Sequence, residues 1–236
     1  MERMKQPLRR LRRALYESVG DPRYTPRPSL NDLDAKLSKY LDYKGGFFIE
    51  VGANDGYKQS NTYYLERGLK WRGVLVEAIP DLYDRCRRLR KRSHVFHNAL
   101  VAPDYPDKSI TMHFADLMSV TAGSMQTDER RQEHIDLGLE CQDIEKSYTV
   151  DVPVRTLSSI LDEVQPPAID FFSLDVEGYE LNVLKGLNVE RYRPEYVLVE
   201  AWEYGEVDAF LSPYYDQVDK LTFHDYLYRA KSSERR

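Results

Sequence analysis

The stretch FFIEVGANDG (residues 47–56) joins an apolar segment to a glycine-bracketed turn with an acidic residue on each side of the first glycine. The apolar segment predicts a buried strand, and Gly52 and Gly56 permit positive φ angles or the close approach of a ligand. Open α/β sheets bind ligands at the carboxyl ends of their strands, where this turn would lie. Glu77 ends the next apolar segment, in a position to accept hydrogen bonds from ribose hydroxyls. These residues predict a nucleotide-like ligand.

The turn does not match either common phosphate-binding motif. The run Gly52-Ala53-Asn54-Asp55-Gly56 lacks the G-x-G-x-x-G spacing of dinucleotide sites, and no Walker lysine is present. Glu50 and Asp55 would repel a pyrophosphate. They suit instead a ligand with cationic groups, such as the sulfonium and ammonium of S-adenosylmethionine. A glycine-rich turn without a ligand is the alternative.

Other polar residues give weaker signals. The five histidines show no metal-ligand spacing, and His113 and His224 are the candidates for an acid/base role or a substrate contact. The run RCRRLRKR (residues 85–92) places six cations on the helix predicted after Glu77. A solvated helix face and a contact with a phosphorylated or acidic substrate are the two interpretations.

Alternating strands and helices must position these residues. Helices are predicted at 29–41, 60–68, 81–92, 157–164, 179–187 and 206–212, and strands at 47–51, 73–77, 94–98, 109–115, 148–156, 168–176 and 195–202. Segments 216–223 and 225–230 predict a closing hairpin at one edge. Continuous apolar strands that alternate with helices are typical of a parallel sheet buried on both faces.

The 236 residues fit one large domain, residues 30–236, with an irregular insertion at about 103–147. Residues 1–29 form a basic tail, with a short amphipathic helix around 8–19 and a proline-broken linker. The tail has eight Lys or Arg against three acids, a net charge of +5, so the rest carries −10 of the total of −5. The acidic body disfavours nucleic-acid binding. The tail either docks on its own domain or is disordered, or it contacts a membrane surface or a partner.

The chain has no run of 18 apolar residues, which predicts no transmembrane helix, and its basic start lacks the apolar core of a secretory signal. The two cysteines, Cys86 and Cys141, lie in unrelated contexts and offer neither a disulfide framework nor a zinc spacing. A reducing cytoplasm is therefore the expected location.

Three blocks together resemble the FkbM-type S-adenosylmethionine-dependent methyltransferases: FFIEVGANDGYKQSNTYYLE, WRGVLVEAIPDLY and IDFFSLDVEGYELNVLKGL. The likeness runs over about residues 41–230 and is least clear at 103–147. It implies a class I methyltransferase fold: a Rossmann-like α/β domain whose seven-stranded, mostly parallel sheet has helices on both faces and an antiparallel final strand. The predicted closing hairpin fits that strand.

The resemblance also implies which residues bind S-adenosylmethionine. Those around its methionine part would be Glu50, Gly52, Ala53, Asn54, Asp55 and Gly56. Those that bind the carboxylate or shape the pocket floor would be Ser60, Asn61 and Thr62. Those at the ribose and adenine would be Glu77, Ala78, Asn98 and Ala99.

The block SLDVEGYE adds the candidate catalytic acids. Asp175 would lie beside the transferring methyl as a general base, with Glu177 in the following turn, and a positioned base contributes about 10²–10⁴-fold. An acid-rich helix N-terminus is the alternative. Asp175 and Glu200, at adjacent strand ends, also resemble the ligands of magnesium-dependent sugar O-methyltransferases, which implies a bound Mg²⁺ or another divalent metal. Ala201, where a third acid would be expected, departs from that pattern.

The predicted function is thus an S-adenosylmethionine-dependent O-methyltransferase. The resemblance implies a sugar hydroxyl of a glycan, glycolipid or glycosylated natural product as its acceptor. One alternative is an O-methyltransferase that acts on a polyketide or lipid hydroxyl. Another is a non-catalytic module that binds S-adenosylmethionine or a glycan as a scaffold. An NAD-dependent enzyme is disfavoured by the missing glycine pattern.

Overall fold

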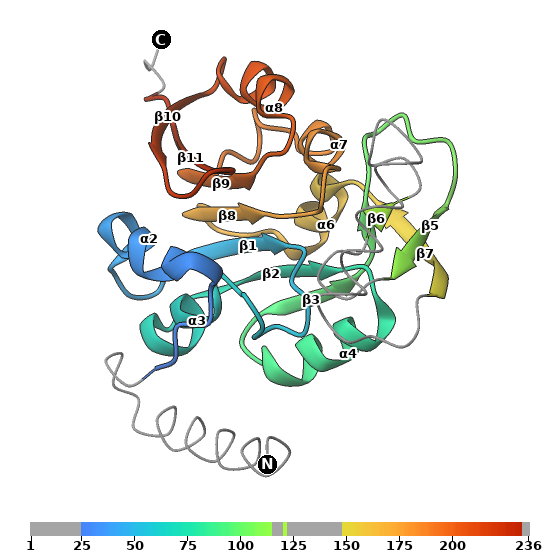
Figure 1. Cartoon of the computed structure of the whole chain (residues 1–236), viewed down its shortest axis with the longest axis horizontal. Coiled ribbons are helices and arrows are strands. Elements are labelled where there is room, and N and C mark those ends of the chain that lie inside the picture. Colours follow the sequence, from blue (N-terminus) through green and yellow to red (C-terminus); the bar gives the residue numbers. More distant parts are fainter. Residues whose placement is uncertain (1–24, 115–119, 122–147, 233–236) are drawn as a thin grey trace.

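The computed structural model describes residues 25–114, 120–121 and 148–232. Its main sheet has seven strands in the order β10-β11-β9-β8-β1-β2-β3 (Figure 1). They are β1 (Phe47–Val51), β2 (Arg72–Glu77), β3 (His94–His97), β8 (Phe171–Leu174), β9 (Tyr196–Glu200), β10 (Tyr215–Lys220) and β11 (Asp225–Ala230). Strands β3, β2, β1, β8 and β9 pair in parallel, and β11 lies antiparallel between β9 and β10. The predicted class I topology, with its closing hairpin at one edge, is confirmed.

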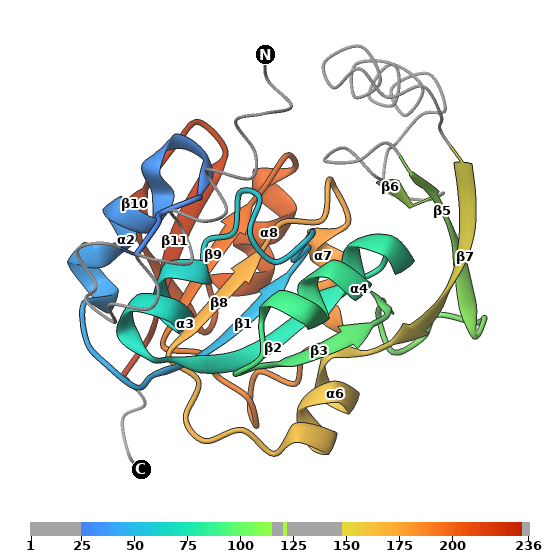
Figure 2. The same cartoon turned by 90° about the horizontal axis from the view of Figure 1, so that it is seen from below.

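Helices cover both faces of this sheet, as expected (Figures 1 and 2). They are α2 (Leu33–Leu41), which follows the 3₁₀ helix η2 (Leu30–Asp32), then α3 (Tyr63–Leu69), α4 (Pro80–Leu89), α6 (Leu157–Val164), α7 (Glu180–Lys185) and α8 (Tyr204–Leu211). One apolar core lies between the sheet and α2 and α3, and the other lies between the sheet and α6, α7 and α8. Helix α4 contributes Leu82 to one core and Cys86 to the other.

Strand β1 is buried at all five positions because both of its faces are covered. Successive side chains of a strand point to opposite faces. Phe48 therefore packs in the core under α2 and α3, and Ile49 packs in the opposite core. Burying each side chain stabilises the fold by about 1.5–3 kcal/mol. The same alternation sends Glu50 to the face of Phe48.

A smaller sheet lies beside the main one, in the order β4-β7-β5-β6 (Figure 2). Its strands are β4 (Ala99–Leu100), β5 (Ser109–Phe114), β6 (Val120–Thr121) and β7 (Tyr148–Arg155). Strand β7 pairs antiparallel with β5 along six residue pairs and parallel with β4. The predicted strands at 109–115 and 148–156 thus form this sheet. Part of the predicted insertion is therefore ordered into strands.

Two predicted helix boundaries were wrong. Helix α3 begins at Tyr63 rather than near residue 60, and α4 ends at Leu89 rather than Arg92. Arg90, the C-cap residue of α4, turns inward and bonds the segment before α3, as described below. The predicted helix at 8–19 and the polar segment at 126–147 lie outside the described residues. Among the described helices, none has the length and apolar character needed to cross a bilayer; the cytoplasmic location stays a prediction.

Candidate active site

A cavity of about 320 Å³ lies at the carboxyl ends of the central strands. Its size falls in the range of small-molecule sites, and its place is where open α/β sheets bind ligands. Of the predicted site residues, those that line it are Gly52, Asn54, Ser60, Asn61, Glu77, Ala78, Asn98, Ala99, Asp175, Glu177, Glu200 and His224. These residues come from the turn after β1, the segment before α3 and the ends of β2, β4, β8, β9 and β11, and they lie up to 172 positions apart in the chain.

Glu77 ends β2 and is held rigidly at the cavity wall. Its Oε2 accepts a hydrogen bond from the backbone N–H of Asn54 (2.7 Å), and its Oε1 accepts one from that of Ile79 (2.8 Å). Burial raises the pKa of Glu77 to about 7, against the lowering effect of these bonds. Each carboxylate oxygen can accept more than one bond, so capacity remains for hydroxyl groups in the cavity.

The glycines of the turn serve the packing of the chain itself. Gly52 has φ +84°, and a Cβ there would lie 1.8 Å from the carbonyl oxygen of Asp175. Gly56 has φ +80°, and a Cβ there would lie 2.9 Å from Cγ of Arg90. Positive φ was expected at both positions. The space without a Cβ, however, is filled by protein atoms rather than left open to a ligand.

Asp55 shapes the turn instead of facing the cavity. Its Oδ1 accepts hydrogen bonds from the backbone N–H groups of Tyr57 (2.9 Å) and Lys58 (2.8 Å). This is the local side-chain-to-backbone bonding that Asp favours in turns. Asp55, Ala53 and Gly56 are not among the residues that line the cavity.

Glu50 does not face the cavity either, which corrects our expectation. It is 4% exposed, and its carboxylate accepts hydrogen bonds from Ser60 Oγ (3.0 Å), the N–H of Asn61 (2.9 Å) and Thr62 Oγ1 (2.6 Å). Arg90 Nη1 lies 3.3 Å from Glu50 Oε2. The sequence placed Arg90 with five other cations on a solvated helix, but its side chain is fully buried. The other five cations are exposed.

Asn61 lines the cavity and carries a buried hydrogen-bond acceptor. Its Nδ2 donates to Ser173 Oγ (3.1 Å), and its Oδ1 is buried without a hydrogen-bond partner among the described residues. An unpaired buried acceptor costs about 1–3 kcal/mol. A ligand with an N–H or O–H group at this place would satisfy it.

The wall beyond Glu77 is apolar. It consists of Val76, Ala78, Ile79, Leu82, Ala99, Leu100 and Met112. Asn98 lines the cavity beside it, and its Nδ2 donates to the carbonyl oxygen of Pro153 on β7 (3.1 Å). The segment that follows the tail closes another side, through Leu30 and Leu33, and is tied to the turn by a bridge between Ser29 and Gln59. Sequence reasoning missed these apolar lining residues, because they carry no chemical signal.

A hydrogen-bonded chain of three residues lies at the other end of the cavity. Asp175 follows β8 and bonds to the carboxyl group of Glu200, whose Oε1 lies 2.8 Å from His224 Nε2. Desolvation, followed by the charge of Glu200, raises the pKa of Asp175 well above its ordinary value. Desolvation also raises the pKa of Glu200, while its bond to Asp175 and the nearby His224 oppose that rise.

The acids around this chain differ in role. Glu177 has φ +54° and lines the cavity, whereas Glu180 accepts hydrogen bonds from the backbone of Val176 (3.3 Å) and Gly178 (2.9 Å) and closes the turn. Burial raises the pKa of Glu180 to about 7. Asp225, which the sequence did not single out, begins β11, is buried and lines the cavity.

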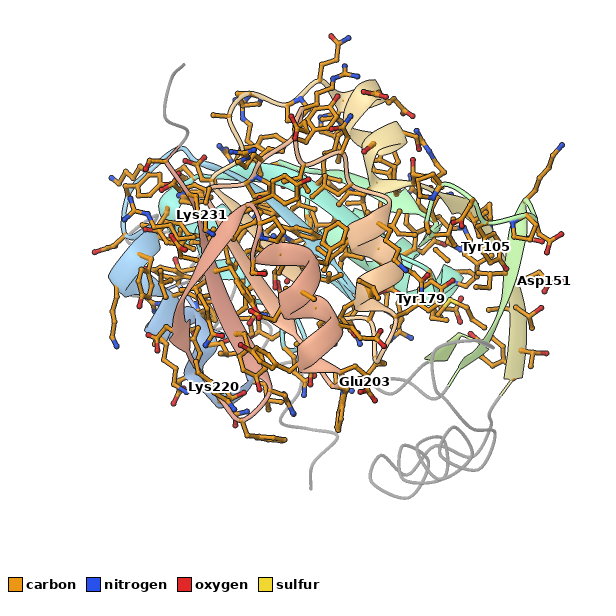
Figure 3. All side chains as sticks on the ribbon, turned by 90° about the horizontal axis from the view of Figure 1, so that it is seen from above. Tyr105, Asp151, Tyr179, Glu203, Lys220 and Lys231 are labelled. Atoms are coloured by element: carbon orange, nitrogen blue, oxygen red, sulfur yellow. The ribbon has the colours of Figure 1, made fainter. Side chains whose placement is uncertain are left out.

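Two predicted site residues remain to be located. Thr62 is fully buried in the network of Glu50 and does not line the cavity. His113 lies in β5, where its backbone pairs with β6 and β7; its side chain is outside the described residues. Figure 3 shows Tyr179, which lines the cavity at the start of α7, with Tyr105 and Asp151 toward the small sheet.

The metal expected at Asp175 and Glu200 would need further ligands. Divalent cations such as Mg²⁺ and Ca²⁺ take six or more ligands, mainly oxygens. The described part of the chain contains no group of three or more His, Cys, Asp or Glu that could hold a metal ion. The two carboxyl groups are bonded to each other rather than spread around a central point. This donor set does not fit a divalent cation.

Aromatic side chains stand at the rim beside His224. The rings of Trp202 and Phe223 lie 5.1 and 3.7 Å from the imidazole ring, and these residues are 51% and 72% exposed. The rings of Tyr204 and Tyr226 lie 4.4 Å apart, tilted by 33°. Large exposed rings beside a cavity suit the binding of a ligand with an apolar face.

Comparison with known proteins agrees with this geometry. A family model described as the FkbM methyltransferase domain matches residues 50–229. The chain is similar to a SAM-dependent methyltransferase from Aquifex aeolicus, with 12% identity over 92% of this chain and 96% of that chain and a TM-score of 0.46. It is also similar to a methyltransferase from Geobacter sulfurreducens, with 13% identity over 92% of this chain and 87% of that chain and a TM-score of 0.45. A third similar structure is an O-methyltransferase from Bacillus cereus in complex with SAH, with 13% identity over 87% of this chain and 84% of that chain and a TM-score of 0.42. No curated protein matches the chain.

Proposed function

Because the chain belongs to the FkbM family of S-adenosylmethionine-dependent methyltransferases, we propose that it is an O-methyltransferase whose acceptor is a sugar hydroxyl. The observation that carries the proposal is the carboxyl pair of Asp175 and Glu200 at one end of the cavity, with Glu77 at the other. The end with Glu77 can hold a nucleoside, and the carboxyl pair at the other end can accept a proton. O-methylation needs both.

The residues of the cavity fit S-adenosylmethionine, which supplies an electrophilic methyl group on its sulfonium. Glu77 would accept the ribose hydroxyls with the lone pairs that Asn54 and Ile79 leave unused. The apolar wall of Ile79 and Leu100 suits adenine. Asn61 Oδ1 would accept from the cationic ammonium group, because it is the buried acceptor that lacks a partner there.

The acceptor hydroxyl must lose its proton as its oxygen attacks the methyl carbon. Two adjacent carboxyl groups disfavour the ionisation of both at once, and the ionised carboxylate of the Asp175–Glu200 pair would take the proton of the acceptor hydroxyl. A base whose pKa approaches the working pH is the most effective, and the raised pKa values of this pair move in that direction. His224 would act through Glu200 by orienting its carboxyl group. Alignment of the acceptor hydroxyl with the methyl group supplies the larger part of the rate acceleration, because it lowers the barrier by about 7–11 kcal/mol.

The rim supports a sugar rather than an extended apolar acceptor. Carboxyl groups of Glu177 and Asp225 line the cavity near the pair and can accept hydrogen bonds from several hydroxyls. The exposed rings of Trp202 and Phe223 can stack on the apolar face of a pyranose. A polyketide or lipid hydroxyl would use the rings but would offer fewer hydroxyl donors to these carboxyl groups.

The test combines calorimetry with an acceptor screen. S-adenosylhomocysteine should bind, and NAD, titrated in parallel, should not. Oligosaccharides, polyketides and lipid alcohols are then incubated with methyl-labelled S-adenosylmethionine, and the methylated atom is identified. We expect a sugar O-methyl product that is lost in Asp175→Asn and kept in the exposed control Glu203→Gln. A methyl group found on nitrogen or carbon, or binding without turnover on any acceptor class, would overturn the proposal, and the latter would favour the scaffold alternative.

A further inference from the structure

Arg90 is the best-connected buried charge among the described residues. Its side chain is fully buried just after α4. The guanidinium donates to Glu66 Oε2 (3.0 Å), Glu50 Oε2 (3.3 Å) and Thr62 Oγ1 (2.8 Å). It also donates to Ser60 Oγ (3.2 Å) and the carbonyl oxygen of Gly56 (3.2 Å). The planar guanidinium group of arginine suits this role better than the ammonium group of lysine would.

These bonds converge on one short segment, residues 56–62. Arg90 holds Gly56, Ser60 and Thr62 directly, and through Glu50 it holds the N–H of Asn61. The segment forms no helix until Tyr63; within it the N–H of Ser60 donates to the carbonyl oxygen of Tyr57 (3.2 Å). The bonds of Arg90 and Glu50 add the side-chain contacts that hold its two ends, Gly56 and residues 60–62.

The same segment forms a wall of the cavity. Four consecutive residues, Lys58, Gln59, Ser60 and Asn61, line it. Asn61 lines the cavity, and its backbone N–H donates to Glu50 Oε1 (2.9 Å). The Arg90 cluster is therefore directly behind the part of the wall that would meet the methionine portion of the cofactor.

The charge of the cluster favours the same ligand. Two carboxylates, Glu50 and Glu66, surround one guanidinium, a formal charge of −1 when all three are ionised. Glu66 Oε1 is buried without a hydrogen-bond partner among the described residues, so one carboxylate oxygen is not neutralised by contact. A negative field behind the wall attracts a cationic group on its other side.

We propose that Arg90 is a positioning residue for the cofactor: together with Glu50 it fixes residues 56–62 so that Asn61 meets the cationic amino-acid end of S-adenosylmethionine. This inference rests on the proposed cofactor site. Arg90 touches neither cofactor nor acceptor. Its loss therefore changes the affinity for the cofactor rather than the chemical step.

The experiment compares Arg90→Lys and Thr62→Val with a matched control. Arg87→Lys changes a neighbouring arginine that is 59% exposed and contacts Asp84 at 3.6 Å. Each variant is titrated calorimetrically with S-adenosylhomocysteine, its folding is followed by thermal unfolding, and KM for S-adenosylmethionine is measured apart from kcat. The acceptor is the one identified in the screen above.

We expect Arg90→Lys to bind S-adenosylhomocysteine about tenfold or more weakly, the effect of losing a hydrogen bond to a charged group. Thr62→Val, which removes the hydroxyl between Glu50 and Arg90, should weaken it in the same direction, and Arg87→Lys should match the wild type. KM for the cofactor should rise while kcat at saturation stays near the wild-type value, a split that general loss of folded protein would not give.

Wild-type affinity in a folded Arg90→Lys variant would overturn the inference, as would a fall in kcat without a change in KM. If Arg90→Lys does not fold, Thr62→Val decides by the same criteria. Failure of the wild type to bind S-adenosylhomocysteine would instead overturn the cofactor site itself, so the two failures are distinguishable.

Discussion

Glu50 and Asp175 lie at the ends of neighbouring strands, β1 and β8, yet their surroundings are opposite. Glu50 is enclosed by Arg90 and by the hydroxyls of Ser60 and Thr62. Asp175 faces the cavity with Glu200 as its bonded partner, and the other charges that act on it are those of Glu177 and Glu180. One carboxylate is neutralised by a buried guanidinium; the other sits among carboxylates.

The comparison separates two uses of an acid at a strand end. A carboxylate bonded to a buried guanidinium holds structure, whereas one crowded by other carboxylates has a raised pKa and can exchange a proton. Position in the sheet is the same for both. The partner decides the role.

The largest effect should come from Asp175→Asn. If Asp175 is the base, kcat falls by about 10²–10⁴-fold, while the affinity for S-adenosylhomocysteine changes little because Asn keeps the shape of the side chain. Single-turnover methylation and calorimetry on the same preparation measure the two. Near-normal turnover would remove the distinction between Asp175 and Glu50.

Arg90→Met tests the surroundings of Glu50, the other acid of the comparison. It leaves Glu50 and Glu66 buried without their cation, and removing one partner of a buried ion pair costs about 3–5 kcal/mol of unfolding free energy. Urea unfolding measures this change. Arg87→Met, at an exposed position, should stay within about 0.5 kcal/mol of the wild type. Equal stability of the two variants would contradict the structural role of the cluster.

Glu77→Ala tests a third acid at a strand end, bound by backbone N–H groups rather than by an arginine. Loss of the ribose contacts should weaken S-adenosylhomocysteine binding about 10- to 100-fold, the range for hydrogen bonds to a charged group. Calorimetry gives the affinity. An unchanged value would take Glu77 out of the ribose site.

The pH dependence of Glu77 gives a smaller effect with a defined sign. Its pKa is about 7 in the folded protein and 4.5 as the ordinary value, so the folded state binds more protons between these pH values. This contribution to stability is fully present below about pH 4.5 and is lost as the pH rises through about 7. Cofactor affinity should move the other way, because the ionised carboxylate is the stronger acceptor for ribose hydroxyls. Glu77→Gln should reduce the slope of the stability profile, of which Glu180 with its pKa of about 7 retains a part, and should flatten the affinity profile. An affinity slope that persists in this variant would assign the titration to another group.

The smallest expected effect is that of excess EDTA on turnover. Asp175 and Glu200 are engaged with each other and with His224, so we expect no change. A loss of activity that Mg²⁺ restores would show that the Asp175–Glu200 pair opens to bind a metal, whereas Glu50 is bonded to a buried arginine.

Much of the fold was predictable because burial leaves a local mark. The strands at 47–51, 73–77 and 94–98 were predicted within a residue or two, since continuous apolar runs between helices are typical of a parallel sheet. Arg90 could have been found by the same logic. Leu82, Cys86 and Arg90 are spaced four residues apart, so the helix face that buries the first two also carries the third inward. Its place in a run of six cations concealed this.

The sequence by itself determined the alternation of strands and helices along the chain, the tight turn at residues 52–56 and the acid that ends β2, because these depend on backbone preferences and short-range periodicity. Only the tertiary structure decided which acids are neutralised. Glu50 meets Arg90 from 40 residues away, and Asp175 meets Glu200 and His224 through two further strands. Charge and pKa depend on distances between side chains that the chain brings together from far apart, and local sequence carries no record of those distances.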